Sequence, residues 1–391
     1  MKKITDYSLF DYIVVGSGFA GTICDRKLAE KGNKILILEK RTHIAGNMFD
    51  YYDNNDLLIH KYGPHIIMTN RPETVEYIKQ FDDIVDISVK METSVQGKVV
   101  PLPININSIN KMYSKTKAQK IIQLLSDEYG YGSEVNILDL LNNKNEILRD
   151  FAQQIYEDVF VGYNVKMWGT DPTKVDRNVV GRVPIRISDE DVRSKYRYNF
   201  VPKQGYTKLF ENILNHSNIT VVTDIDATDV ITINNNSILV DGKSFNNKVI
   251  YTGPLDALFD FKYGKLPYRS VFFKKTIVKE NNEFTGLALT YPKKYSKFRT
   301  SDMERVTGVG VKGKVAMISE YAGEYDTQSN KFNVPSYPVI NENNLNMLNK
   351  YKNLADSIDK FYYIGRLAEF KYYNMSEIIE TAFEFVKQII K

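Results

Sequence analysis

A glycine-rich turn between two apolar segments constrains the fold of this chain more than any other feature of its sequence. Tyr12–Val15 reads as a buried strand, Gly16–Gly21 has the form Gly-x-Gly-x-x-Gly, and Thr22–Lys31 has helical character that ends at Gly32. Lys34–Leu38 then reads as a second strand. This order of strand, turn, helix and strand predicts a doubly wound α/β domain that binds a dinucleotide.

Each glycine of the turn has a separate role in such a domain. Gly16 permits the tight turn, Gly18 lets the backbone approach a pyrophosphate, and Gly21 allows the helix to pack closely. The phosphates then meet the helix N-terminus, which begins near Phe19 and Ala20. The pattern therefore predicts that these five positions bind the cofactor.

The residues after the second strand favour FAD over NAD. Glu39 ends that strand, where a carboxylate accepts hydrogen bonds from the ribose hydroxyls of the adenosine half. Lys40 follows, and a loop of small residues leads to Gly46 and Asn47. Such a loop lets the chain pass over the pyrophosphate and the ribityl chain, with Asn47 as a polar contact.

Composition excludes several other classes of function. Lys and Arg number 52 against 48 Asp and Glu, without a basic stripe, so nucleic acid is not an expected partner. Four histidines and one cysteine predict no metal site and no intrachain disulfide. We expect no membrane span, because no apolar run approaches about 18 residues, and we expect a cytoplasmic protein.

The spacing of apolar residues differs between the remaining segments of the chain. Apolar residues recur at helical spacing over 117–168, and short β-branched runs occupy 219–251 around a turn of three asparagines. Further strands are expected at Val271–Val278, Gly286–Tyr291, Arg305–Val311 and Val315–Tyr321, and then at Phe361–Ile364, before a closing helix at Ser376–Ile390. The chain is thus expected to return to its first domain.

We therefore expect an α/β protein with a Rossmann-like FAD-binding domain, a helical insertion and an antiparallel β-sheet substrate domain. The length of 391 residues favours more than one domain. The expected boundaries are 1–75, 205–262 and 338–391 for the FAD-binding domain, 105–178 for the helical insertion, and 76–104, 179–204 and 263–337 for the substrate domain.

Beyond the glycine turn, the sequence resembles the bacterial UDP-galactopyranose mutases nearly end to end. The glycine turn alone is common among dinucleotide-binding proteins, whereas the matching runs together are highly specific. They are Tyr12–Gly18, Leu38–Arg41 with Gly46-Asn47, His60–Ile66, Gly162-Tyr163 with Trp168-Gly169, Arg182–Arg186, Gly205–Leu209, Tyr251–Pro254, Tyr268–Ser270, Tyr337–Val339 and Gly365–Tyr372.

The resemblance implies an isomerase that interconverts the pyranose and furanose forms of UDP-galactose. In that family reduced FAD attacks the anomeric carbon through N5, UDP leaves, and the sugar ring opens and closes again without net redox change. It also implies an external reductant for the flavin, such as NAD(P)H, and a homodimer built through the helical insertion.

Site residues follow from the same resemblance. Arg182 and Arg299 match a pair of arginines that neutralise the diphosphate, and His60 lies on the strand beside the isoalloxazine ring. The expected substrate-binding residues are Tyr163, Trp168, Arg182, Arg193, Arg299, Tyr337 and Tyr372. The expected cofactor-binding residues are Gly16, Gly18, Phe19, Ala20, Gly21, Glu39, Lys40, Gly46, Asn47, His60, Gly365, Arg366, Tyr372, Asn374 and Met375.

Three residues depart from the family pattern. Arg193 stands where the family usually has a phosphate-binding tyrosine, Asn374 replaces an aspartate, and Ala45 replaces a glycine. Arg193 either serves the same diphosphate or belongs to a segment rebuilt for another sugar nucleotide, such as UDP-N-acetylgalactosamine or a deoxyhexose nucleotide. The sequence leaves both alternatives open.

Two rival functions share the dinucleotide fold. An FAD-dependent oxidoreductase of the amine-oxidase type would show the same glycine turn, because a fold does not specify a reaction. A scaffold that binds FAD without catalysis is the other rival. Arg182, Tyr337 and Tyr372 argue against that scaffold, since such a protein has no need of phosphate-binding residues.

Overall fold

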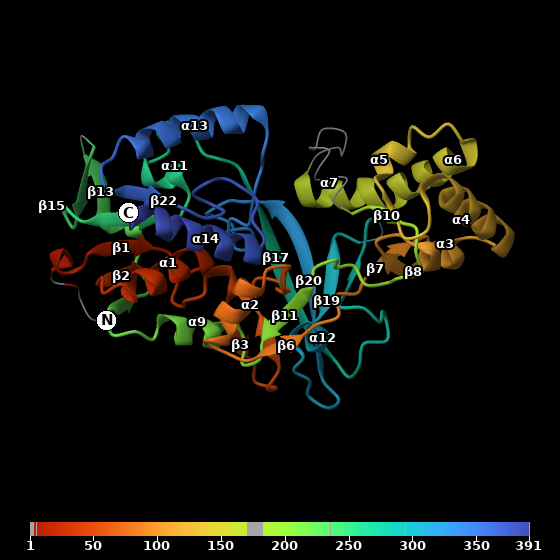
Figure 1. Ribbon diagram of the computed structural model, residues 1–391, viewed down its shortest axis with the longest axis horizontal. Coiled ribbons are helices and arrows are strands. Elements are labelled where there is room, and N and C mark those ends of the chain that lie inside the picture. Colours follow the sequence, from red (N-terminus) through yellow and green to blue (C-terminus); the bar gives the residue numbers. More distant parts are fainter. Residues whose placement is uncertain (1–3, 5, 170–182, 235, 294, 391) are drawn as a thin grey trace.

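The computed structural model describes residues 4, 6–169, 183–234, 236–293 and 295–390. An α/β body that contains both chain ends is joined through a large β-sheet to a helical region on the other side of the molecule (Figure 1). The body begins with a short 3₁₀ turn, η1 (Tyr7–Leu9), which leads into the first strand.

The body is built on a five-stranded parallel sheet. Its strands, in spatial order, are β12 (Ile219–Val222), β2 (Ile35–Leu38), β1 (Tyr12–Val15), β16 (Lys248–Tyr251) and β22 (Phe361–Tyr363). The sheet runs outward in both directions from β1, which is the arrangement of a doubly wound fold, and ligands in such folds bind at the carboxyl ends of the strands.

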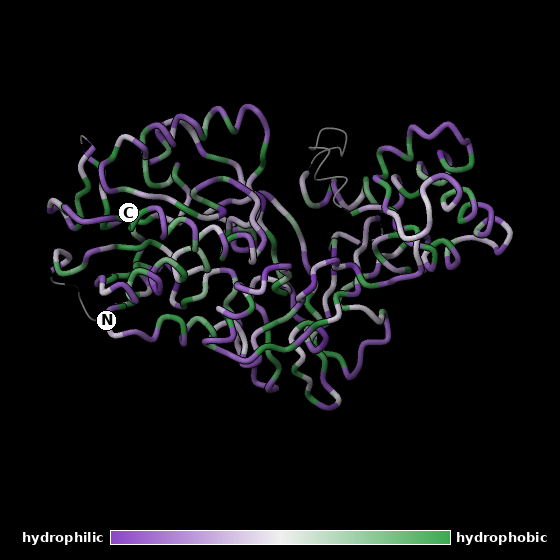
Figure 2. The backbone as a smooth tube through the Cα atoms, in the orientation of Figure 1, coloured by the Kyte–Doolittle hydropathy of each residue, from purple (hydrophilic) through white to green (hydrophobic). Residues whose placement is uncertain are grey.

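Alternating residues of β1 supply the two faces of this sheet. Tyr12 and Val14 pack into a core under α1 (Phe19–Ala29), α9 (Tyr206–Leu214) and α14 (Met375–Ile389). Ile13 and Val15 pack into a second core under α13 (Glu342–Asp356) and α11 (Leu255–Leu258). The outward-facing helix α13 is mostly hydrophilic (Figure 2), as expected for a helix that covers a sheet.

The second large element is a seven-stranded sheet. Its order is β21 (Tyr337–Pro338), β17 (Tyr268–Val278), β20 (Val315–Glu324), β19 (Arg299–Asp302), β18 (Ala288–Thr290), β7 (Met91–Val95) and β8 (Lys98–Leu102). Every neighbouring pair is antiparallel except β18 and β7. Chain segments that lie far apart in the sequence thus meet in one sheet.

Smaller sheets connect these two parts. They are β3 (Asp50–Tyr52) with β4 (Leu58–His60), β5 (Ile67–Thr69) with β11 (Tyr198–Pro202) and β6 (Ile84–Asp86), β9 (Glu134–Val135) with β10 (Ile185–Arg186), and β13 (Ile231–Asn234) with β14 (Ser237–Val240) and β15 (Lys243–Ser244). The helices α2 (Pro72–Lys79) and α10 (Ala227–Val230) and the 3₁₀ turn η2 (Gly46–Met48) complete the body.

The helical region contains α3 (Ile106–Met112), α4 (Lys115–Tyr129), α5 (Ile137–Leu140), α6 (Glu146–Ile155) and α7 (Gly162–Trp168). A π-helical segment, Tyr156–Val161, joins α6 to α7 without a break. Such segments are rare and recur at functional sites, because the wider turn rotates the residues that follow it. The helical region shares one core with the seven-stranded sheet, which includes Leu125, Phe151, Met91 and Ile318.

Most of the expected elements are present, and one is of the wrong type. The strand expected at Arg305–Val311 is instead the helix α12 (Met303–Thr307). The Asp302 carboxylate caps this helix by accepting a hydrogen bond from the backbone N–H of Arg305. Gly308 ends it in the left-handed conformation, with a φ of 72°. The two caps outweigh the β-branched character of the segment.

The fold class expected from the sequence is confirmed. The parallel sheet with its glycine turn, the helical insertion and the largely antiparallel second sheet are all present. The three-stranded sheet takes one strand from residues assigned to the FAD-binding domain and two from residues assigned to the substrate domain. The exact domain boundaries stay a prediction.

Candidate active site

The glycine turn is shaped by close backbone contacts. A Cβ on Gly16, whose φ is 95°, would lie 2.2 Å from the Thr252 hydroxyl oxygen, and one on Gly21 would lie 2.0 Å from the Gly16 carbonyl oxygen. At Gly18 the same atom would point into open space, without a heavy atom within 4 Å. Gly16 and Gly21 therefore serve packing, whereas Gly18 leaves room beside the turn.

The start of α1 fits a diphosphate. Gly18 is its N-cap and supplies no side-chain hydrogen bond, so the first backbone N–H groups of the helix remain available to an anion. The ring of Phe19 turns inward against Phe210, at 4.7 Å between ring centroids, and Ala20 is buried. Phe19 and Ala20 therefore offer backbone groups to a cofactor.

Glu39 lies at the end of β2, beside the turn. Its carboxylate accepts hydrogen bonds from the Ser17 backbone N–H at 2.9 Å, the Ser17 hydroxyl at 2.7 Å and the Arg41 backbone N–H at 2.9 Å. These bonds fix the carboxylate in place and leave lone pairs for the ribose hydroxyls. Lys40 turns away to pair with Asp226 at 2.6 Å, which leaves its backbone as the candidate contact.

The loop after Glu39 passes directly over the glycine turn. A Cβ on Gly46 would lie 3.0 Å from Gly18 Cα, and the buried Ala45 takes the left-handed conformation with a φ of 71°. The Asn47 side-chain oxygen accepts a hydrogen bond from Arg41 Nη2 at 2.8 Å, while Arg41 Nη1 is buried without a hydrogen-bond partner. An orphaned buried donor at this point fits a site that receives a polar ligand.

The returning strand β22 completes the cofactor side. Gly365, with a φ of 112°, brings the chain against Ala20 of α1, so that its Cβ would lie 3.2 Å from the Ala20 Cβ. Asn374 is the N-cap of α14 and forms a reciprocal capping box with Glu377, while Met375 starts that helix. The helices α1 and α14 pack together. Both follow strands of the parallel sheet, so their N-termini lie at the same edge of it, at the carboxyl ends of the strands.

Aromatic rings and one arginine gather where α7, β21 and the turn after β22 meet. Tyr337 and Tyr372 stack at 6.0 Å and 10°, and the Trp168 ring meets Tyr337 edge-on at 6.3 Å. The Arg366 guanidinium lies 5.5 Å from the Tyr337 ring and 5.2 Å from the Tyr372 ring. Burial is the largest cause that raises the pKa of Tyr337 to about 12, so its hydroxyl keeps its proton and can donate to a phosphate.

Arg299 and Glu320 form a bidentate ion pair beside this cluster. The two residues are directly opposite in the β19–β20 ladder, with Nε–Oε1 at 2.6 Å and Nη2–Oε2 at 2.7 Å. The buried Glu320 carboxylate raises the pKa of Arg299 despite the opposing effect of burial. Burial also raises the pKa of Tyr163, although the nearby charges of Arg299 and Arg193 oppose that shift.

Hydrogen bonds hold the backbone at Arg193 in place. Its N–H donates to the Val89 carbonyl at 2.7 Å, and its own carbonyl accepts a hydrogen bond from Arg186 Nη2 at 3.3 Å. The Arg186 guanidinium also holds the Val192 carbonyl and pairs with Glu134 at 3.0 Å. These bonds fix the backbone at Arg193, whose charge lies close enough to Tyr163 to oppose the rise of its pKa.

His60 is buried between His65 and Asp50, and its catalytic role stays a prediction. Its ring is 2% exposed, its Nδ1 accepts from the His65 N–H at 3.1 Å, and its Nε2 lies 4.0 Å from the Asp50 carboxylate. Burial lowers its pKa to about 3, so the ring is neutral. Burial is the largest cause that lowers the pKa of His65, and the nearby charges of Arg366 and Arg299 lower it further. The Nδ1 atom of His65 is buried without a hydrogen-bond partner.

The structure thus brings together Tyr163, Trp168, Arg193, Arg299, Tyr337, Arg366 and Tyr372, while Arg182 lies outside the described residues. The sequence prediction missed Glu320, which shares the inward face of β20 with Ala316 and Ile318. An acid at a core-facing position of an apolar strand was the available signal, because buried carboxylates need a partner.

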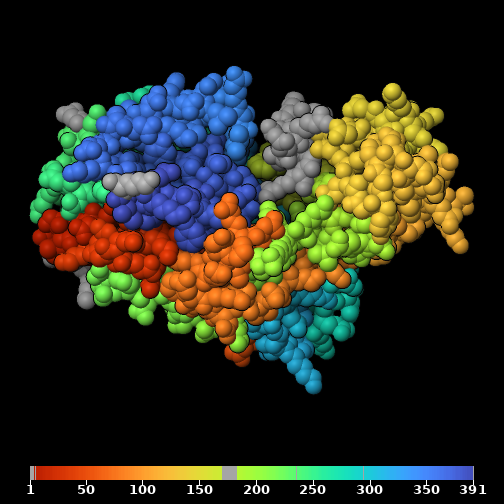
Figure 3. Space-filling view, in the orientation of Figure 1, coloured from red at the N-terminus to blue at the C-terminus, as the bar shows by residue number. Residues whose placement is uncertain are grey.

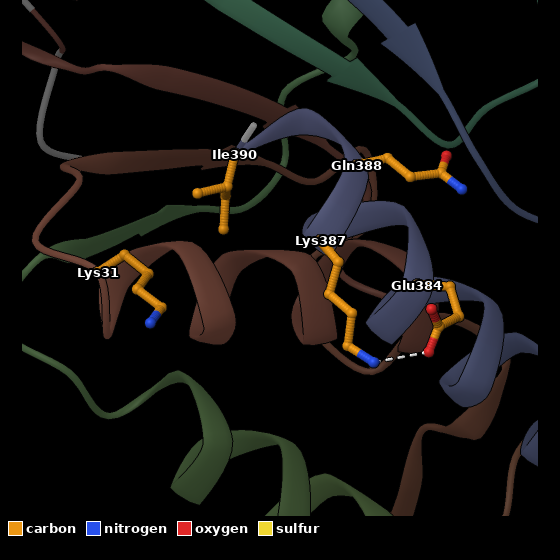
Figure 4. Close-up of a pocket in the computed structure, with 5 residues that line it drawn as sticks. All are labelled: Lys31, Glu384, Lys387, Gln388 and Ile390. Carbon is orange, nitrogen blue, oxygen red and sulfur yellow. Dashed lines mark hydrogen bonds and ion pairs between the residues drawn. The ribbon is translucent and has the colours of Figure 1, made fainter.

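The remaining surface offers no competing centre among the residues that the structure describes. In that part of the chain no cluster of histidine, cysteine and acidic side chains could hold a metal, and no helix is long and apolar enough to cross a membrane. A shallow hollow of about 530 Å³ is lined by Lys31, Glu384, Lys387, Gln388 and Ile390, of which Glu384 and Lys387 form an ion pair (Figure 4). Figure 3 shows a second hollow, between the body and the helical region.

Comparison with known proteins decides the family. The sequence profile of the UDP-galactopyranose mutases matches residues 158–372, which include the aromatic and arginine cluster. The chain belongs to this family. A second profile, that of an NAD(P)-binding Rossmann-like domain, matches residues 14–81 and covers the glycine turn.

Full-length relatives agree with this assignment. A probable UDP-galactopyranose mutase of Klebsiella pneumoniae is 28% identical, over 96% of this chain and 95% of the relative. A dTDP-fucopyranose mutase of Escherichia coli is 27% identical over 97% and 98%, and a UDP-galactopyranose mutase of Mycoplasma pneumoniae is 27% identical over 99% and 98%. The family therefore contains members named for different nucleotide sugars.

Solved structures show the same fold. A reduced UDP-galactopyranose mutase superposes with a TM-score of 0.73 at 16% identity, over 97% of this chain and 94% of the other. A putative protoporphyrinogen oxidase gives 0.64 at 12%, over 97% and 98%, and a putrescine oxidase gives 0.58 at 10%, over 97% and 98%. The fold is thus shared with oxidases, whereas membership of the mutase family makes this chain an enzyme of the mutase class and indicates a flavin cofactor.

Proposed function

We propose that this member of the UDP-galactopyranose mutase family interconverts the pyranose and furanose forms of a nucleotide sugar, with UDP-galactose as the first candidate. The observation that carries the proposal is the convergence of Tyr163, Trp168, Arg299, Tyr337 and Tyr372 from four parts of the chain. Cationic, phenolic and planar aromatic groups together suit a substrate that has a diphosphate and a base. Reduced FAD, when bound, supplies the nucleophile that replaces the nucleoside diphosphate on the sugar.

The protein's own residues divide the remaining work. The Arg299 guanidinium, together with the paired hydroxyls of Tyr337 and Tyr372, would hold the diphosphate as it leaves and keep it in place for its return. Tyr163 would stack on the base, and Trp168 would shield the opened sugar from water. Arg182 is proposed as the second arginine on the diphosphate. Gly18, Glu39, Gly46 and Gly365 would bind the FAD.

A panel of substrates tests this proposal. Dithionite-reduced protein is incubated with UDP-, TDP- and GDP-linked pyranoses, and the products are separated by chromatography. We expect isomerisation of at least one UDP-sugar without consumption of further reductant. Isomerisation of none of them in either direction would refute the mutase proposal, and flavin reduction by a substrate or release of hydrogen peroxide in air would favour the oxidase alternative.

Another nucleotide sugar is the second candidate. The E. coli relative named for dTDP-fucopyranose shows that the family extends beyond UDP-galactose, and Arg193 replaces the usual phosphate-binding tyrosine in this chain. The fixed backbone around Arg193 favours a contact to the diphosphate that all these substrates share. An external reductant such as NAD(P)H, a homodimer and a cytoplasmic location stay predictions.

Replacing Arg193 by tyrosine separates the two roles. If Arg193 binds the diphosphate, Arg193→Tyr should raise KM by about threefold to tenfold, since one charge-assisted contact is lost, and should weaken the salt dependence of KM. Steady-state kinetics at low and high ionic strength measure both effects. Arg197→Tyr, a change of an exposed arginine in the same segment, is the control. A changed preference among sugars would instead assign Arg193 to the sugar.

A further inference from the structure

Lys166 ties α7 to the loop that precedes Arg299. Its ammonium donates to the Tyr291 carbonyl at 2.5 Å and to the Lys297 carbonyl at 3.3 Å. These two carbonyls stand at opposite ends of the loop between β18 and β19, and Arg299 begins β19 two residues after Lys297. The lysine therefore fixes the position from which Arg299 enters the candidate site.

Arg269 ties the same helix to the strand that carries Tyr337. Its Nε donates to the Met167 carbonyl at 2.6 Å and its Nη2 to the Lys166 carbonyl at 3.1 Å. These carbonyls belong to the last turn of α7, which has no partners for them within the helix. In the β17–β21 pair Arg269 is directly opposite Tyr337, whose ring contacts Trp168.

Backbone contact leaves little freedom between α7 and the loop. A Cβ on Gly162, the first residue of α7, would lie 2.3 Å from the Pro292 carbonyl oxygen. At the rim of the same interface Lys293 pairs with Asp158 at 2.6 Å, with the lysine side chain 59% exposed. The Lys293 end of the rim pair is in solvent, and Asp158, 14% exposed, keeps a second hydrogen bond from Gln96 Nε2 at 2.9 Å, whereas Arg269 is 6% exposed and Lys166 is half-buried. The inner contacts are therefore the ones costly to break.

The desolvation of the two cations, Lys166 and Arg269, also indicates that their contacts are costly to break. Burial lowers the pKa of Lys166 and of Arg269, which shows that each charge gives up hydration. The Arg269 guanidinium lies on the last carbonyls of α7, where the helix dipole stabilises a cation, whereas the Lys166 ammonium is held by two carbonyls of the facing loop. Sliding or rotating α7 would leave these donors and carbonyls without hydrogen-bond partners, which is costly for groups removed from water.

We propose that Lys166 and Arg269 form a brace that holds Tyr163 and Trp168 in register with Arg299 and Tyr337. Both are positioning residues, because their side chains bond to the protein backbone and act on the substrate through the residues they hold. This inference rests on the proposed function, since it assumes that Tyr163 and Trp168 bind the nucleotide. The brace predicts that nucleotide affinity depends on two residues that need not touch the nucleotide.

Trp168 provides a direct readout, because it is the only tryptophan of the chain. Its fluorescence is titrated with UDP in the flavin-loaded protein, without any turnover. Lys166→Met keeps the length of the side chain and removes the ammonium. We expect its Kd for UDP to rise by about tenfold, with altered Trp168 emission and with flavin content close to wild type. The melting temperature should fall, because the Tyr291 and Lys297 carbonyls lose their donor. Lys166→Arg should recover part of the affinity.

Lys293→Met is the matched control, because it removes the ammonium of an exposed lysine at the rim of the same interface. Its Kd should stay within about twofold of wild type, because a solvated lysine contributes little and Asp158 keeps its hydrogen bond from Gln96. If Lys166→Met does not fold, Arg269→Lys takes its place, because it keeps the charge but loses the fork that spans two carbonyls.

The outcomes separate the brace from the proposed function. A Lys166→Met or Arg269→Lys variant that folds, binds UDP as tightly as wild type and shows unchanged Trp168 emission would overturn the brace. A wild-type protein that binds UDP while isomerising no sugar would refute the mutase proposal, and the brace would stand if the Lys166→Met variant binds UDP more weakly. A wild-type protein that binds neither UDP nor dTDP would overturn both.

Discussion

Arg299→Ala is expected to lower turnover by about 10²–10³-fold while the flavin stays bound, because a preorganised cation on a departing diphosphate contributes several kcal/mol to transition-state stabilisation. Its guanidinium is held by Glu320 through two short bonds and remains 20% exposed on the candidate site. The geometry therefore leaves one edge of the guanidinium for the substrate. Turnover of the reduced enzyme and the flavin absorbance of the purified protein measure the two parts of the prediction.

The same substitution has a second effect that must be separated from the first. Removing Arg299 leaves the Glu320 carboxylate, which is 2% exposed, buried without its cation, and such losses destabilise proteins by about 3–5 kcal/mol. The double variant Arg299→Ala, Glu320→Ala removes both charges. It should recover most of the free energy of unfolding while its turnover stays low. Wild-type turnover in the double variant would show that Arg299 serves stability rather than catalysis.

The sequence predicted the body of the protein well because its signals are local. The strand at Tyr12–Val15, the glycine turn and Glu39 lie within one short stretch, and each is where a dinucleotide fold requires it. The segment Arg305–Val311 was mistaken for a strand because its β-branched residues are visible in the sequence. The two caps that make it a helix are the hydrogen bond to the Asp302 carboxylate and the left-handed conformation of Gly308, and both depend on the folded backbone.

The candidate site was predictable only in part. Resemblance to a family supplied Tyr163, Arg299, Tyr337 and Tyr372, and the structure places them together. Periodicity alone would not have done so, because the residues come from a helix, two strands and a turn. The roles of the two neighbouring histidines depend on which ring nitrogen meets which backbone group. No pattern of residue types reveals that a buried His60 supports the His65 backbone.

Glu320, Lys166 and Arg269 were missed for a common reason. Each acts on a partner that is distant in the sequence, namely a cross-strand arginine, a loop carbonyl or a helix end. Charged residues that hold the site residues in position contact other protein groups rather than the ligand. The sequence marks Glu320 as an acid within an apolar strand, but the partners of all three residues are visible only in the structure.

Asp25→Ala is expected to raise the free energy of unfolding by about 2 kcal/mol, although it truncates a buried side chain in the first helix of the FAD-binding domain. Asp25 lies on α1, is 0% exposed, and both of its carboxylate oxygens lack a hydrogen-bond partner. The Tyr77 hydroxyl is also buried without a hydrogen-bond partner. Burial is the largest cause that raises the pKa of Tyr77, and the charge of Asp25 adds to this rise. Alanine removes the desolvated acid and leaves a small space, whose cost is included in this figure.

The dependence on pH distinguishes this explanation from a gain in helix propensity. Burial raises the pKa of Asp25 well above its usual value, so the folded protein keeps a proton that the unfolded chain releases above about pH 4. The contribution of Asp25 to stability is therefore complete below pH 4 and is lost as the pH rises through the raised pKa. The advantage of Asp25→Ala should accordingly grow with pH in urea titrations. Asp150→Ala, on an exposed face of α6, offers the same propensity gain and should show no such growth, and a pH-independent advantage for Asp25→Ala would rule out the buried-acid explanation.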